Sequence, residues 1–212
     1  MVHRAGKAGR SRSWLVHVIG RPSSVDRVAR VHLVRHGRAA AGWDTDPDPG
    51  LDDAGRLQAM ETAEQLSRLD RMEIVSSPLR RCRETAAELS RLWVDQPIAI
   101  EPRVAEIPSP QGVPMEERVI WLRGVMGGSW TDLDDTYRAF RRDIVTYVSG
   151  LKTDTVIFSH FIAINVVIGA CLGDDSVVID SLDNASVTVV EVDGSGGLHI
   201  VERGRLANTL IR

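Results

Sequence analysis

Short β-type runs alternate along this chain with longer segments whose apolar residues recur at helical spacing. The β-type runs cover residues 30–34, 73–75 and 155–158. Four segments show helical spacing, and their apolar residues are Ala59, Met60, Ala63 and Leu66; Leu79, Cys82, Ala86, Leu89 and Trp93; Leu133, Tyr137, Phe140, Ile144 and Val148; and the run 162–172. Because the last run is apolar all round, it predicts a buried helix.

Turn and capping residues mark where these elements begin and end. The first helix is entered through the turn-rich residues 46–50, and Gly173 stops the last helix. Ser77 is placed to act as the N-cap of the second helix, with Pro78 at its first helical position. Residues 97–130 hold several prolines and glycines, which predicts an extended loop region suited to a substrate lid, with one short helix around 116–123.

The order of these elements predicts an α/β fold. Strands that alternate with helices favour a mostly parallel central sheet covered on both faces, which makes a three-layer α/β/α sandwich. A closing hairpin over residues 186–192 and 198–202 adds an antiparallel edge strand. The pattern of regular elements starts near residue 28, so we expect a flexible basic leader over residues 1–28 and one domain over 29–212.

Composition and charge narrow the class of protein. The 212 residues are 43% hydrophobic and 26% charged, which is ordinary for a folded domain. Residues 1–30 carry seven Lys or Arg and one Asp, a net charge of +6. Since the whole chain has a net charge of −3, residues 31–212 carry −9, and this acidic balance disfavours a nucleic-acid-binding protein. The longest apolar run has twelve residues, against the roughly 20 that a bilayer span needs. Cys82 and Cys171 fit reduced, packed thiols in a cytoplasmic protein.

Residues with phosphate-binding chemistry follow the predicted strands. Arg35 and His36 follow the first strand, Arg81 lies near the start of the helix after the second, and His160 follows the third. Because the carboxyl ends of parallel strands meet at one edge of a sheet, we expect one cationic pocket. Arginine donates two parallel hydrogen bonds to phosphate oxygens, and a neutral histidine can attack phosphorus to form a phosphohistidine without a metal or cofactor.

The residues around this expected pocket also match a known family in sequence order. The matching segments are LVRHG at residues 33–37, LDDAGRLQA at 51–59, SSPLRRCRETA at 76–86, VIFSH at 156–160 and NASV at 184–187. In this combination the chain resembles the histidine phosphatase superfamily, which has the phosphoglycerate-mutase-like fold, over about residues 30–203.

The resemblance implies a role for each residue of the pocket. His36 corresponds to the nucleophile that accepts the phosphoryl group, and Arg35, Arg81 and His160 correspond to the groups that bind it. Glu106 corresponds to the acid that protonates the leaving oxygen. Three other glutamates of the loop region remain alternatives for that acid, namely Glu101, Glu116 and Glu117.

Two departures from the family pattern touch the expected pocket wall. Phe161 stands where a glycine commonly follows the second histidine, and residues 108–112 replace a stretch usually rich in glycine and tryptophan. We expect both changes to affect substrate choice and turnover more than the phosphate site itself.

The sequence therefore predicts a cytoplasmic, metal-independent phosphomonoester hydrolase that acts through a phosphohistidine on His36. The expected partner is a small phosphorylated molecule rather than a nucleic acid or a membrane, and a homodimer is left open. The alternatives are a phosphoglycerate-mutase-type phosphotransferase, a phosphoprotein phosphatase and a non-catalytic module that binds a phosphorylated ligand.

Overall fold

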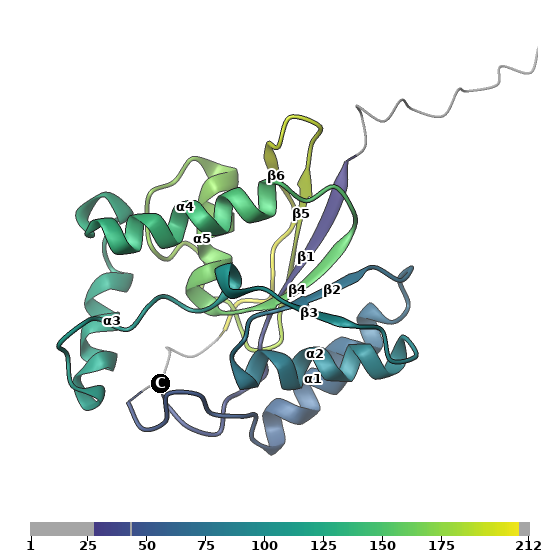
Figure 1. Ribbon diagram of the computed structural model, residues 1–212, viewed down its shortest axis with the longest axis horizontal. Helices are drawn as coiled ribbons and strands as arrows, with labels where there is room; N and C mark the ends of the chain where they lie inside the picture. The colour runs from purple at the N-terminus through teal and green to yellow at the C-terminus, as the bar shows by residue number, and fades with distance from the viewer. Residues whose placement is uncertain (1–27, 43, 208–212) are drawn as a thin grey trace, which may run out of the picture.

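A six-stranded sheet forms the centre of the protein (Figure 1). The computed structural model describes residues 28–42 and 44–207, so the expected leader lies outside the described residues except for its last position. The strands lie in the spatial order β3-β2-β4-β1-β5-β6. Their bounds are β1 (Ala29–Arg35), β2 (Glu73–Ser76), β3 (Ile98–Ile100), β4 (Thr155–Ser159), β5 (Val187–Val192) and β6 (Leu198–Glu202).

The strand directions confirm the mostly parallel sheet. The neighbours β3, β2, β4 and β1 pair in parallel, whereas β5 pairs antiparallel with both β1 and β6. The antiparallel strand β5 therefore lies one position inside the edge, and β6 forms the edge itself. β4 enters the sheet between β1 and β2 although it comes much later in the chain, and all five of its residues are buried.

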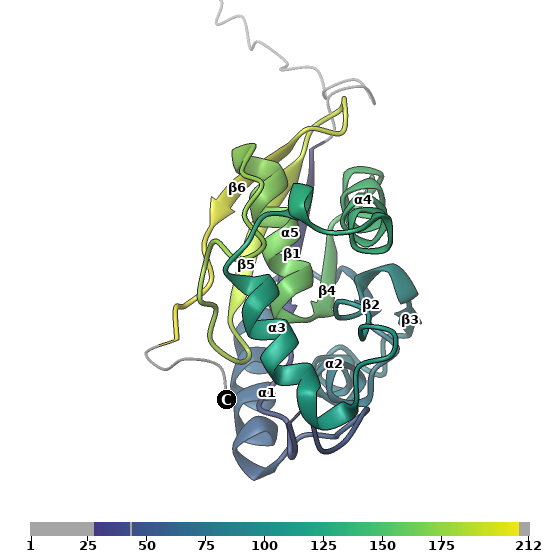
Figure 2. The same cartoon turned by 90° about the vertical axis from the view of Figure 1, so that its left-hand side faces the viewer.

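Helices on both faces complete the predicted three layers (Figure 1). α1 (Asp53–Leu66) and α2 (Arg80–Leu92) pack together on one face. α4 (Asp135–Ser149) and α5 (Phe161–Leu172) pack together on the other. α3 (Arg118–Met126) lies beyond the carboxyl ends of the parallel strands (Figures 1 and 2).

Alternating strand side chains supply one apolar cluster to each face. On β1, Val34 belongs to the cluster under α1 and α2, whereas Leu33 belongs to the cluster under α4 and α5. α1 departs from the predicted apolar face at one position. Met60 is 48% exposed although Ala59 beside it is buried, because successive residues of a helix point about 100° apart.

The loop region 97–130 is more structured than predicted. It contains β3, α3 and three short 3₁₀ helices, which are Pro102–Val104, Met115–Glu117 and Trp130–Asp132. β3 was not predicted, since it has only three residues and they are partly or fully exposed, so no alternation of apolar and polar residues marks it. Main-chain pairing with β2, from Ile74 with Ile98 onward, is what makes it a strand.

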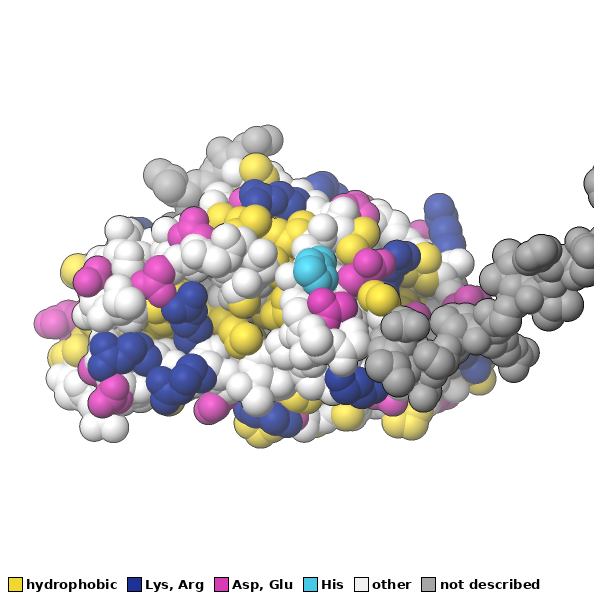
Figure 3. Space-filling view, turned by 90° about the horizontal axis from the view of Figure 1, so that it is seen from above, with side chains coloured by type: hydrophobic (Ala, Val, Ile, Leu, Met, Phe, Trp, Pro, Cys, Tyr) yellow, Lys and Arg dark blue, Asp and Glu magenta, His cyan; other side chains and the backbone are white. Residues whose placement is uncertain are grey.

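The outer surface mixes charges of both signs. On the face seen in Figure 3, basic and acidic side chains are interspersed around apolar ones, so no single-sign field covers this face. Among the described helices, none combines the length and apolarity that crossing a bilayer requires.

Candidate active site

The connections of β1 and β4 leave the sheet towards opposite faces. β1 leads to α1, whereas its neighbour β4 leads to α5 on the other side (Figure 1). Such a switch point leaves a crevice at the carboxyl ends of the two strands. The parallel register pairs Arg35 with Ser159, so the residues that follow them, His36 and His160, come side by side. Their ring centroids are 5.2 Å apart.

Arg81, in the first turn of α2, bridges the two imidazole rings. Its Nε donates to His36 Nε2 at 3.2 Å, and its Nη2 donates to His160 Nδ1 at 3.1 Å. Since a guanidinium has only donors, both of these ring nitrogens carry lone pairs. The other ring nitrogens then carry the hydrogens, so His36 Nδ1 donates to the Gly37 carbonyl at 2.7 Å and His160 Nε2 donates to Ser77 Oγ at 2.7 Å.

Burial and neighbouring positive charge keep both histidines neutral. Burial is the largest cause that lowers the pKa of His36 and of His160 well below the ordinary value of 6.5, and Arg81 is the next cause for each. A neutral His36 with a hydrogen on Nδ1 keeps a lone pair on Nε2, where it accepts from Arg81 Nε, and this is the form that a nucleophile needs.

Two buried guanidinium nitrogens at this site have no hydrogen-bond partner within the described part of the chain. They are Arg35 Nε and Arg81 Nη1. Arg35 is held elsewhere, since its Nη1 donates to the Leu182 carbonyl at 2.6 Å and its Cζ lies 5.1 Å from the centre of the Phe161 ring. An unpaired buried donor costs about 1–3 kcal/mol, so the pocket favours an oxyanion that accepts from both arginines.

Glu106 joins this pocket from the segment after the 3₁₀ helix Pro102–Val104. Its carboxylate accepts from the backbone N–H of Ile107 at 3.0 Å and of Ile162 in the first turn of α5. Burial is the largest effect and raises the pKa of Glu106, although Arg81 and Arg35 act in the opposite direction. The structure therefore brings all five predicted residues to one place.

The alternative acids have other environments. Glu101 forms an ion pair with Arg103 at 2.7 Å, and hydrogen bonding to that arginine lowers the pKa of Glu101. Glu116 and Glu117 are exposed. Glu106 is thus the one of these four glutamates whose environment favours a protonated carboxyl group.

Ser77 is not the helix N-cap that its sequence position predicted. α2 begins only at Arg80, after Leu79 in an extended conformation, and Ser77 Oγ accepts from the Leu79 N–H at 3.2 Å. Because the helix begins later than predicted, the Ser77 hydroxyl also lies within hydrogen-bond distance of His160 Nε2. Ser77 is therefore a site residue, and its place in the SSPL segment is the only signal that the sequence offers for it.

Further residues that sequence reasoning did not single out hold the backbone around His36. The Gly37 N–H donates to Thr85 Oγ1 at 3.1 Å, and Asn184 Nδ2 donates to the His36 carbonyl at 3.2 Å. Cys82 Sγ donates to the Ser159 carbonyl at 3.3 Å, and burial raises the pKa of its thiol. Thr85, Cys82 and Asn184 all fall within the segments that carry the family resemblance.

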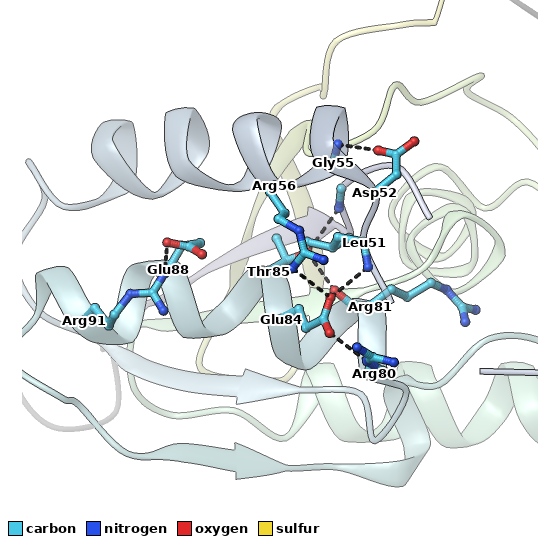
Figure 4. Close-up of polar contacts among 11 residues, drawn as sticks. Leu51, Asp52, Gly55, Arg56, Arg80, Arg81, Glu84, Thr85, Glu88 and Arg91 are labelled. Atoms are coloured by element: carbon cyan, nitrogen blue, oxygen red, sulfur yellow. Dashed lines mark hydrogen bonds and ion pairs between the residues drawn. The ribbon is translucent and has the colours of Figure 1, made fainter. Parts of the chain in front are cut away.

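The starts of α1 and α2 support the loop that follows β1. A Cβ atom on Gly37 would lie 2.4 Å from the Gly55 carbonyl oxygen, so the two backbones can meet this closely only as glycines. Glu84 accepts from the Leu51 N–H and from Arg80 Nε, both at 2.7 Å. Figure 4 shows this network and the Arg81 side chain extending away from it.

In the parts of the chain that the structure describes, residues 28–42 and 44–207, no three His, Cys, Asp or Glu side chains gather in an arrangement that could hold a metal ion. The polar groups at the switch point are instead two neutral imidazoles, two guanidiniums and one partly buried carboxyl group.

Fold and site together define an α/β protein of the phosphoglycerate-mutase-like class. Residues 31–203 match the family model of the histidine phosphatase superfamily (branch 1). The chain therefore belongs to this family. The solved phosphoglycerate mutase of Bacillus anthracis has the same fold, with a TM-score of 0.68 at 17% identity over 85% of this chain and 94% of that one.

Two curated proteins are similar in sequence. A glucosyl-3-phosphoglycerate phosphatase of Mycolicibacterium vanbaalenii is 38% identical over 84 residues, which is 38% of this chain and 37% of that protein. The match thus spans little more than a third of this relative. A Schizosaccharomyces pombe protein described as a probable phosphatase is 26% identical over 189 residues, which is 81% of this chain and 90% of that protein.

Proposed function

We propose that the protein hydrolyses phosphate monoesters through a phosphohistidine formed on His36. The observation that carries the proposal is the pair of unpartnered buried donors, Arg35 Nε and Arg81 Nη1, on the two arginines beside a neutral His36 whose Nε2 accepts from Arg81 Nε. Phosphatases among the similar proteins support the same reaction class. Because the long 3.2 Å contact from Arg81 Nε occupies this lone pair, Arg81 exchanges it for a phosphate oxygen when the ester binds.

The reaction then has two steps. His36 Nε2 attacks phosphorus, the bond from phosphorus to the ester oxygen breaks, and Glu106 gives its proton to the leaving oxygen. Glu106, now ionised, takes a proton from a water molecule whose oxygen attacks phosphorus. The bond from phosphorus to His36 Nε2 breaks, which releases inorganic phosphate and restores the neutral imidazole. Arg35 and Arg81 stabilise the charge on the transferred oxygens in both steps, and His160 joins them when its Nε2–H exchanges Ser77 Oγ for one of those oxygens.

Rapid mixing with p-nitrophenyl phosphate tests this mechanism. We expect a burst of p-nitrophenol and acid-labile phosphate on the protein, and His36→Ala should abolish both and reduce turnover at least about a thousandfold. His199→Ala is the matched control, since His199 is exposed and pairs with Asp193 on the β5–β6 hairpin. Equal activity of wild-type protein and His36→Ala would refute the proposed nucleophile.

The alternatives give different results in the same preparation. A mutase-type phosphotransferase would isomerise phosphoglycerate faster than it releases phosphate, and a binding module would bind vanadate without hydrolysis. Glucosyl-3-phosphoglycerate, named for the Mycolicibacterium relative, belongs in the substrate panel together with phosphoproteins. Four statements stay predictions: a small phosphorylated substrate, a cytoplasmic location, the lack of nucleic-acid and membrane partners, and a homodimer as one of the oligomeric states.

A further inference from the structure

Phe161 is the aromatic residue that touches the candidate site. It opens α5 directly after His160, at the position where the family resemblance leads to a glycine. Only 5% of its surface is exposed, and its ring belongs to the apolar cluster under α4 and α5. The side chain therefore reaches the site from the core rather than from the solvent side of the pocket.

Strand pairing brings this ring to Arg35. The parallel register places Arg35 opposite Ser159, two residues before Phe161. Arg35 points to the same face as Leu33, because alternate residues of a strand share a face, and Leu33 and Phe161 belong to one apolar cluster. The contact at 5.1 Å between Arg35 Cζ and the ring centre thus follows from the two central strands, not from a loose surface loop.

Within the described residues one hydrogen bond holds the Arg35 guanidinium, and Glu106 and Asp183 add electrostatic attraction without a hydrogen bond. Nη1 donates to the Leu182 carbonyl at 2.6 Å, and Nε is buried with no partner in the described residues. One hydrogen bond lets a planar guanidinium turn about that contact, whereas an aromatic face within about 6 Å attracts the cation and excludes water from one side. Ring and carbonyl together define the direction in which Nε points.

We propose that Phe161 is a positioning residue that orients the Arg35 guanidinium for the phosphoryl group. This inference rests on the proposed function, because it assigns Arg35 to phosphate binding. The aromatic face holds the guanidinium so that its unpartnered Nε meets an incoming phosphate oxygen without first losing side-chain freedom. The residue that departs from the family pattern therefore supports the phosphate site.

Substitutions that separate ring electrostatics from ring volume test the proposal. Replacing Phe161 by phenylalanines with one, two and three ring fluorines keeps the shape while weakening the negative face of the ring. We expect the affinity for inorganic phosphate, measured by calorimetry, to fall with each fluorine, and Phe161→Leu to weaken it by about ten- to thirtyfold. KM for p-nitrophenyl phosphate should rise in parallel, with a smaller change in kcat.

Phe140→Leu is the matched control. Phe140 lies on α4, away from Arg35, and packs on Trp130 against the same apolar cluster, with 6.1 Å between ring centres. This variant should lose stability yet keep the wild-type phosphate affinity. Affinity that does not depend on the fluorines, or an equal loss in both leucine variants, would overturn the role of Phe161. Absence of turnover in wild-type protein would instead count against the proposed function, because phosphate binding is measured without turnover.

Discussion

Asn165 offers a test of how α5 holds the loop that supports Arg35. This residue is fully buried in the middle of an otherwise apolar helix. Its Oδ1 accepts from the Ile179 and Asp180 N–H groups at 2.9 and 2.8 Å, and its Nδ2 donates to the Asp180 carbonyl at 3.1 Å. The segment continues to Leu182, whose carbonyl accepts from Arg35.

Asn165→Leu keeps the number and branching of the side-chain heavy atoms and removes every one of these bonds. The Asp180 carbonyl still accepts from the Leu182 N–H at 3.0 Å, so the unpaired groups are the N–H groups of Ile179 and Asp180. Each buried unpaired group costs about 1–3 kcal/mol, and the added apolar surface offsets part of this cost. We therefore expect the free energy of unfolding to fall by about 2–4 kcal/mol. This is a large part of the roughly 5–15 kcal/mol that stabilises a domain.

Urea unfolding, followed by circular dichroism, measures this loss. Thr62→Val serves as the reference, because it removes the single bond from Thr62 Oγ1 to the Ala185 carbonyl, 2.8 Å long, and should cost about 1 kcal/mol. Hydrogen exchange should also show faster exchange of the Ile179 and Asp180 amides. If Asn165→Leu cost no more than the reference variant, the two N–H groups would have found other partners, and the reasoning would be wrong.

Two further predictions concern the proposed acid, Glu106, and the glycine contact beside the proposed nucleophile, His36. Burial lowers the pKa of His36 below 6.5 and raises that of Glu106 above 4.5, so kcat/KM should persist at acidic pH and fall on the alkaline side as Glu106 ionises. Glu106→Gln should remove that alkaline fall. Ionisation of the substrate affects wild-type protein and the variant equally, so it cannot cause a difference between them. An unchanged pH profile would exclude Glu106 as the acid. A Cβ on Gly55 would lie 2.1 Å from the Arg38 carbonyl oxygen, so Gly55→Ala should lower stability by about 3 kcal/mol or more. A Cβ on Gly124 in α3 would have no atom within 4 Å, so Gly124→Ala should be neutral or stabilising by up to about 1 kcal/mol. Thermal unfolding compares the two, and equal shifts would contradict the contact argument.

Local sequence patterns were enough to predict most helices and strands. The β-type run 30–34 became Ala29–Arg35, and the apolar run 162–172 became Phe161–Leu172, ended by Gly173 in the left-handed conformation. These elements follow from side-chain periodicity and from residues that start or stop a helix, which are properties of neighbours in the chain. β3 was missed for the same reason, because only its partner strand makes it a strand.

The site shows a similar division. The polar residues at strand ends identified His36, His160, Arg35 and Arg81 as one group, and the family resemblance added Glu106. Ser77 was assigned the wrong role, because the sequence could not show that α2 begins at Arg80, two residues later than predicted, and leaves this hydroxyl facing His160. A side chain in a turn has several local options, and only the packing around it selects one.

The amino-acid order alone specified which residues end each strand and which chemistry they carry. The tertiary structure decided that β4 pairs with β1 in the register that sets Arg35 opposite Ser159, and hence that two histidines 124 positions apart share one arginine. It also decided that Phe161 lies against Arg35. Both outcomes depend on long-range strand pairing and on the burial of two separate apolar clusters, and neither can be read from the periodicity of a single segment.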